Sequence, residues 1–137
     1  MFNKETEYAF RALVYIQAQN IMGLRPGIDE IARETDAPRF YMAKILQRLV
    51  RQGFLLSMKG KGGGFYFDKE KPELTMKEVI VAVEGDRSLT GCGFGFKNCD
   101  PRNPCPLHSQ YAMIRSTVDH LVTNETIQSL ARKSLAK

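Results

Sequence analysis

The sequence contains no long apolar run, and its first residues lack the features of a secretory leader. No stretch approaches the roughly 18 consecutive apolar residues that a membrane-spanning helix needs. Residues 1–7 mix both charge signs and contain no apolar core of a signal peptide. Both absences argue against a membrane protein and a secreted one, so we expect a cytoplasmic protein without membrane contacts.

Cysteine and histidine are also scarce. Three cysteines and two histidines occur in 137 residues, and all the cysteines lie between Cys92 and Cys105. An odd number of clustered cysteines in a cytosolic chain argues against a disulfide framework and favours shared chemistry in one loop. The histidines and the scattered acids form no recognisable nucleophile–base arrangement, so the sequence does not predict an enzyme.

Basic residues are concentrated in one segment. The formal net charge is +5, and the isoelectric point is about 9.2. Six basic residues and no acidic residue fall between positions 39 and 61, so the rest of the chain is close to neutral. A solvated face is the simplest explanation of a charge run, whereas confinement to one segment is typical of phosphate contacts to nucleic acid.

Apolar periodicity predicts a first helix followed by a helix-turn-helix. Asn3 is positioned to cap a helix that continues to about residue 18 and has one apolar face. A short helix is expected over residues 28–34, followed by a turn over residues 35–37. Pro38 suits the first turn of the next helix, whose apolar stripe ends just before Gly53. Two short helices joined in this way form a helix-turn-helix.

A glycine-rich hairpin is predicted directly after these helices. Two aromatic and apolar runs, residues 54–59 and 65–67, flank the glycine-rich residues 60–64. A hairpin at this place is a wing, and glycines at its tip would let the backbone approach DNA closely. The tip residues that we expect at the DNA are Lys59, Lys61, Gly62 and Gly63.

The second half of the chain predicts a helix, an irregular loop and a long helix. Thr75 and Glu78 form a capping box for a helix that ends at Gly85. Residues 85–108 show no periodicity, which in a compact domain is typical of function or disorder. Ser109 is expected to cap the long helix, in which four apolar residues have heptad spacing: Tyr111, Ile114, Val118 and Leu121. This spacing favours pairing with a second copy, and packing on the core explains it nearly as well.

The predicted fold class is therefore mainly α with a small β-hairpin: a winged helix-turn-helix plus a long C-terminal dimerisation helix. We expect a DNA-binding domain over residues 1–84, a cysteine sensor loop over residues 85–108, and a dimerisation helix and tail over residues 109–137. A short closing helix is expected within that tail, around Ile127, Leu130 and Leu135.

The second helix of a helix-turn-helix lies in the major groove, where its amino-terminal polar face touches bases. Arg39 and Gln47 are the side-chain types that pair with guanine and adenine. Lys44, Arg48 and Arg51 are better suited to phosphate contacts, which position the protein without specifying sequence. A winged helix also serves as a protein-interaction module, and that alternative stays open.

The three cysteines suggest a metal or redox site. Cys92, Cys99 and Cys105 are separated by six and five residues, and His108 follows shortly after. Three thiolates with one further ligand complete an iron–sulfur site. The same set fits tetrahedral zinc, although structural zinc sites usually space paired ligands two to four residues apart. A metal-free thiol sensor is a third interpretation.

On these motifs the chain resembles the bacterial winged-helix iron–sulfur regulators, the family that includes IscR, NsrR and RirA. The resemblance covers nearly the whole chain. Its marks are Glu7-Tyr8-Ala9, Ile31-Ala32, Tyr41-Met42, Ile45-Leu46, the glycine wing of residues 59–65 and the three cysteines.

The resemblance implies that Cys92, Cys99 and Cys105 ligate an iron–sulfur cluster, with 2Fe-2S favoured and 4Fe-4S as the alternative. It implies either His108 or the partner's Glu7 as the fourth ligand. It also implies a homodimer on near-palindromic double-stranded DNA, with Tyr41 among the DNA-binding residues, and control by redox state, nitric oxide or iron status.

Two departures from the family limit what is carried over. Six residues separate the first two cysteines here, whereas many relatives have five, so the cluster type cannot be inferred from the family. Ala43 stands where the cluster-assembly regulator IscR has a glutamate, so the operator sequence of this chain cannot be inferred from that relative either. The sequence leaves open a thiol-switch or zinc-binding repressor on the same fold, and a cluster-carrier or electron-transfer protein.

Overall fold

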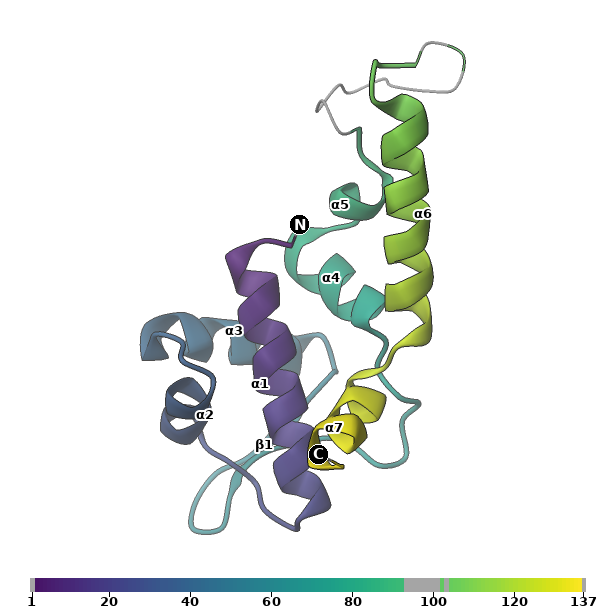
Figure 1. Cartoon of the computed structure of the whole chain (residues 1–137). Helices are drawn as coiled ribbons and strands as arrows, with labels where there is room; N and C mark the ends of the chain where they lie inside the picture. The colour runs from purple at the N-terminus through teal and green to yellow at the C-terminus, as the bar shows by residue number, and fades with distance from the viewer. Residues whose placement is uncertain (1, 93–101, 103, 137) are drawn as a thin grey trace.

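A computed structural model of the chain describes residues 2–92, 102 and 104–136 (Figure 1). It confirms a mainly helical fold with one small antiparallel hairpin. Its elements are, in order, α1 (Lys4–Ile21), α2 (Ile28–Glu34), α3 (Arg39–Arg51), β1 (Leu56–Met58), β2 (Gly64–Tyr66), α4 (Met76–Glu84), α5 (Arg87–Thr90), α6 (His108–Asn124) and α7 (Ile127–Leu135).

The first three helices begin and end where local chemistry dictates. The Asn3 side chain accepts a hydrogen bond from the Thr6 amide at 2.9 Å, and so starts α1 as predicted. Pro38 is the residue that precedes α3 rather than part of its first turn, because its ψ of 134° is extended. Gly53 follows α3 with a φ of 82°, a left-handed conformation that glycine adopts without a steric penalty.

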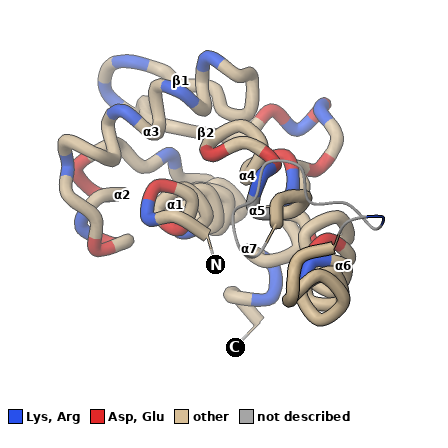
Figure 2. The backbone as a smooth tube through the Cα atoms, turned by 90° about the horizontal axis from the view of Figure 1, so that it is seen from above, with Lys and Arg blue, Asp and Glu red and all other residues tan. Residues whose placement is uncertain are grey.

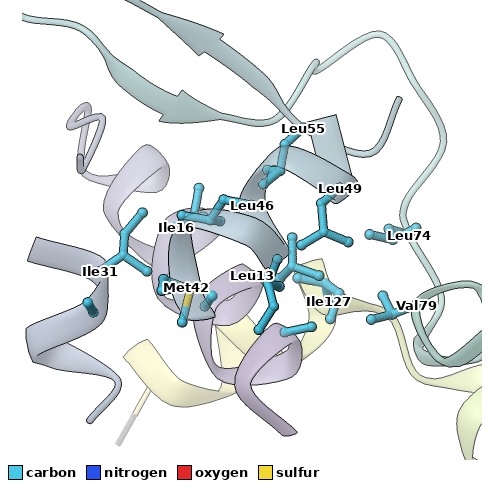
Figure 3. Packing of buried hydrophobic residues seen from close by; sticks show 14 residues of the cluster. Leu13, Ile16, Ile31, Met42, Leu46, Leu49, Leu55, Leu74, Val79 and Ile127 are labelled. Carbon is cyan, nitrogen blue, oxygen red and sulfur yellow. The ribbon is translucent and has the colours of Figure 1, made fainter. Parts of the chain in front are cut away.

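The core lies between α1 and the helix-turn-helix. Leu13 and Ile16 of α1 meet Met42, Leu46 and Leu49 of α3, and all five side chains are fully buried (Figure 3). These positions follow the helical periodicity of the sequence, so one face of each helix is apolar and the other is left for solvent or a ligand.

The C-terminal helix α7 returns to this core. Thr126 caps α7 by accepting a hydrogen bond from the Ser129 amide at 2.9 Å, and Ile127 and Ala131 are fully buried. The Ile127 amide also donates to the carbonyl of Leu74 at 2.8 Å, which joins the start of α7 to the chain before α4. The closing helix is thus present, and it packs on the winged fold rather than extending from the long helix as a tail.

The hairpin is docked on the segment that precedes α2. β1 and β2 pair with Ser57 opposite Phe65. The Phe65 amide donates to the Pro26 carbonyl at 2.9 Å, and Asn20 brackets Phe65 by donating to its carbonyl and accepting from the Phe67 amide. The strands are shorter than the predicted runs, but these hydrogen bonds hold β2 against the connection between α1 and α2.

The segment after α4 departs from the sequence prediction in two ways. A single helical turn, α5, forms where no periodicity was found. The long helix α6 begins at His108, so Ser109 lies inside it, and the preceding Leu107 makes no side-chain cap. The prediction that Ser109 caps this helix was therefore wrong.

The heptad-spaced residues of α6 differ in burial. Val118 packs against a small cluster made by Ile80, Leu89 and Val122. Ile114 and Leu121, on the adjacent part of the same face, are about half exposed. The heptad-spaced row therefore divides between packing within the subunit and an open apolar face.

Candidate nucleic-acid interface and cysteine site

The outer face of α3 presents aromatic and basic side chains opposite the core. Phe40 is 66% exposed, and the Lys44 Nζ lies 4.3 Å from the centroid of its ring. Tyr41 packs edge-on against Phe40, while Gln47 and Arg51 are exposed farther along the helix. A cation held over an aromatic ring is pre-positioned rather than freely mobile. The face therefore combines fixed positive charge with exposed ring surface.

A groove of about 600 Å³ separates this face from the hairpin. Gln47 and Arg51 line its α3 side, and Lys59 lines its hairpin side. Figure 2 shows lysine and arginine positions on the hairpin and on α3, in the same part of the view. The groove consequently has basic residues on both walls.

Two arginines of α3 are engaged elsewhere. Arg39 donates from Nε to Asp29 of α2, and both side chains are well exposed. Such a surface pair contributes little and exchanges easily with another acceptor. Arg48 instead donates to the Val83 carbonyl at 3.2 Å and to Glu5 at 3.4 Å, so it lies on the flank that faces α4 and α1.

The wing tip requires glycine at several points. Gly60 and Gly62 have φ values of 93° and 79°. A Cβ on Gly63 would lie 2.2 Å from the Met58 carbonyl oxygen, so the two strands could not close there. Lys59 and Lys61 are both exposed at this tip. The structure thus has the predicted tight glycine turn with exposed lysines.

Sequence reasoning did not single out Arg25, which lies beside the wing. Its guanidinium carbon is 3.9 Å from the Tyr66 ring centroid, and its Nη1 lies 3.3 Å from the Met58 sulfur. Arg25 comes from the connection between α1 and α2, so only the docking of that connection on β2 reveals it. No role for Phe40 followed from the sequence either, because periodicity does not show whether a large ring is exposed.

The structure brings two of the three cysteines together. The Sγ atoms of Cys92 and Cys105 lie 3.4 Å apart, although 12 residues separate them in sequence. Cys105 is buried, whereas Cys92 is partly exposed. Cys99 lies outside the described residues.

The two candidates for a fourth ligand occupy different helices. His108 is the first residue of α6, and its amide donates to the Cys105 carbonyl at 3.0 Å. Glu7 is exposed on the first turns of α1, 3.9 Å from the Lys4 Nζ. Within residues 2–92, 102 and 104–136, no three histidine, cysteine or acidic side chains converge in one cluster.

Residues 2–133 match the family model described as Rrf2, iron-dependent transcriptional regulator. The chain belongs to the Rrf2 family. This match confirms the family resemblance drawn from the sequence, and it establishes a transcriptional regulator with a helix-turn-helix. No helix in the described part of this Rrf2 protein is long and apolar enough to cross a membrane.

Curated relatives of this Rrf2 regulator are distant in sequence, and the matches extend over most of both chains. An HTH-type transcriptional regulator of Aquifex aeolicus is 26% identical over 95% of this chain and 90% of its own. The HTH-type transcriptional regulator IscR of Serratia proteamaculans is 24% identical, over 90% of this chain and 74% of its own.

Solved structures share the fold. CymR of B. subtilis, titled the global cysteine regulator, superposes with a TM-score of 0.76 at 17% identity, covering 97% of both chains. T. potens IscR superposes with a TM-score of 0.73 at 15% identity, covering 98% of this chain and 88% of that one. At these identities the likeness concerns the arrangement of the helices and the wing alone.

Proposed function

We propose that this Rrf2 regulator binds double-stranded DNA with α3 in the major groove and the wing beside it. The observation that carries this proposal is the basic groove between the outer face of α3 and the hairpin. Lys44, Arg51, Lys59 and Lys61 supply phosphate contacts, with Gly62 and Gly63 admitting the backbone. Gln47 and Tyr41 face the bases, and Arg39 exchanges Asp29 for DNA.

Two further residues belong to this surface. Phe40 offers an exposed ring for thymine methyl groups, and Arg25 extends the positive charge along the side of the wing. Arg48 contributes mainly by holding α3 against α1 and α4, because both its partners lie on that flank.

Salt dependence tests the DNA-binding proposal. Four basic residues in each of two subunits give eight phosphate contacts, so the affinity should fall by about 10⁴ between 50 and 200 mM salt. Fluorescence anisotropy on a duplex selected from a random library would measure this. Lys61→Ala should reduce the slope by about two contacts per dimer. Lys133→Ala, an equal charge change on α7, is the matched control. A flat affinity across this salt range would contradict the proposal.

We further propose that the active form is a homodimer paired through α6. Leu107, directly before α6, and Ile114 and Leu121 within it form an exposed apolar row at intervals of seven residues, with Met113 also exposed, and the described residues leave this row uncovered. Burying such a face against a second copy is favourable, and its heptad spacing suits helix pairing. A two-fold dimer would present two recognition helices to a near-palindromic operator.

The cysteine site is proposed as the sensor. Two metal–sulfur bonds of about 2.3 Å at a tetrahedral angle place two sulfurs about 3.8 Å apart. The 3.4 Å between Cys92 and Cys105 is close to this, so the pair fits a shared metal corner. Cys92, Cys99 and Cys105 would hold an iron–sulfur cluster, 2Fe-2S favoured over 4Fe-4S, with His108 or the partner's Glu7 as the fourth ligand. Bound there, the cluster would supply reversible one-electron chemistry and sensitivity to oxidants.

The position of the site explains how sensing would reach DNA. Figure 1 shows the amino-terminal end of α6 at one end of the molecule and the hairpin at the other, and Cys105 lies three residues before α6 begins. A change at the cysteines therefore acts on α6, and through it on the spacing of the two recognition helices. A coupling of about 1.4 kcal/mol would change DNA affinity tenfold.

A thiol switch without metal is the second candidate. The same 3.4 Å separation requires only a small approach to reach disulfide geometry. Anaerobic purification with iron and acid-labile sulfide counted per chain separates the candidates. Visible absorption with matched iron and sulfide supports the cluster. Colourless protein that stays iron-free after reconstitution favours the thiol switch, or zinc if that metal copurifies, and leaves the DNA-binding proposal intact.

A further inference from the structure

Helix α6 ties down the residues immediately before Cys92. Arg115, in the middle of α6, donates from Nη1 to the Thr90 carbonyl at 2.6 Å and to the Gly91 carbonyl at 2.9 Å. Thr90 is the last residue of α5, so the guanidinium satisfies carbonyls at a helix end, where positive charge is favoured. Both bonds are charge-assisted and therefore stronger than neutral ones.

The Arg115 guanidinium is partly withdrawn from water. Its Nε is buried and has no acceptor among the described residues. The centroid of the Tyr111 ring lies 5.6 Å from the Arg115 Cζ. Because the local dielectric is lower than in water, the two bonds to the loop hold more firmly than a surface contact would.

The backbone between α5 and Cys92 is closely packed. The Gly91 amide donates to the Arg87 carbonyl at 2.6 Å, and a Cβ on Gly91 would lie 2.5 Å from that same oxygen. The chain therefore leaves α5 along a closely packed course, and holding the Gly91 backbone limits where the next residue, Cys92, can lie.

Cys105 is positioned by the amino-terminal end of the same helix, α6. The Cys105 carbonyl accepts from the His108 amide, and Cys105 is buried three residues before α6 begins. Both thiols are thus positioned relative to α6, one through the first turn of the helix and the other through Arg115.

We propose that Arg115 is the positioning residue of the cysteine site and holds Cys92 against Cys105. The inference deepens the proposed sensor function and rests on it. Arg115 bonds the backbone ahead of Cys92 rather than a sulfur, so it acts through geometry. Its removal should lower the effective concentration of one thiol at the other, whatever the thiols bind.

Equilibrium with glutathione measures this effective concentration without metal or DNA. In the full chain carrying Cys99→Ser, only Cys92 and Cys105 are left to pair. Each thiol gives up one proton and one electron to glutathione disulfide. One protein S–S bond forms, the S–S bond of glutathione disulfide breaks, and two glutathione thiols are released. The oxidised fraction, trapped with a thiol-blocking reagent and weighed by mass spectrometry, gives the equilibrium constant.

Arg115→Met in this background should lower the constant about tenfold, and Arg115→Lys, which keeps a cation, should lower it less. The matched control is Lys77→Met, which removes another charged tie to α6, the 2.9 Å bond to Asp119. The control should change the constant less than twofold even if it lowers the melting temperature equally. Equal constants for Arg115→Met and Lys77→Met would overturn the proposal. If Arg115→Met does not fold, an Arg115→Lys constant equal to that of the parent would overturn it instead.

This experiment can fail independently of the proposed function. A protein that binds DNA and assembles a cluster, yet shows no effect of Arg115 on thiol pairing, refutes only the role of Arg115. A protein that assembles no cluster and binds DNA equally well with oxidised or reduced thiols, yet loses thiol pairing in Arg115→Met, refutes the sensor proposal and leaves the role of Arg115 intact.

Discussion

Replacing Gly64 by alanine tests how the wing is held. A Cβ at this position would lie 2.2 Å from the Arg25 carbonyl oxygen, and the φ of Gly64 is 146°. A side chain in such a sparsely populated backbone region costs about 1–3 kcal/mol. The clash also separates β2 from the preceding connection, which removes the hydrogen bond from the Phe65 amide to Pro26, worth about 1 kcal/mol. We expect Gly64→Ala to lose about 3 kcal/mol of unfolding free energy.

Gly62→Ala is the matched control, because the same substitution two residues away meets no atom within 4 Å. Its φ of 79° still carries a left-handed penalty of about 1 kcal/mol. Urea unfolding of both variants gives the difference, and hydrogen exchange at the Phe65 amide locates it. If Gly64→Ala is no less stable than Gly62→Ala and the Phe65 amide stays protected, the docking of the wing on residues 25–26 is wrong.

Three further predictions follow from contacts described above. Arg51→Ala should reduce the salt dependence of DNA binding by about two contacts per dimer, whereas Arg48→Ala should lower stability and leave that slope unchanged; equal slopes would contradict the assignment. Ile114→Arg should yield a folded monomer in analytical ultracentrifugation, and a persisting dimer would exclude α6 as the interface. Burial, with a hydrogen bond to Glu30, raises the pKa of Tyr15 from 10.0 to about 12. Its stabilisation is therefore complete below pH 10 and lost as pH rises through 12. Wild type should lose stability relative to Tyr15→Phe in that window, and a constant difference would refute the contact.

Periodicity and capping chemistry predicted most of the helices because both are local. Asn3, Thr75 and Gly53 act at the ends where the sequence places them, and the apolar stripe of α3 is the buried one. The glycine wing was predictable for the same reason, since a left-handed φ at Gly60 and Gly62 is a property of the turn itself.

Features that depend on contacts between distant parts of the chain could not be predicted from the sequence. Nothing near Arg48 in the chain reveals that its partners are Glu5 and Val83. Its contact with a DNA phosphate stays a prediction. Arg25 reaches the side of the wing only because residues 25–26 dock on β2. The start of α6 was misplaced by two residues: Ser109 is a good cap by type, but the capping position is Leu107 and His108 is already helical.

The return of α7 to the core has a consequence for synthesis. The core side chains Leu13 and Ile16 leave the ribosome early, whereas Ile127 is made more than 100 residues later. The DNA-binding fold therefore cannot be completed until α6 has already emerged. In the proposed dimer, pairing of α6 with a second copy would therefore compete in time with closure of the winged core by α7.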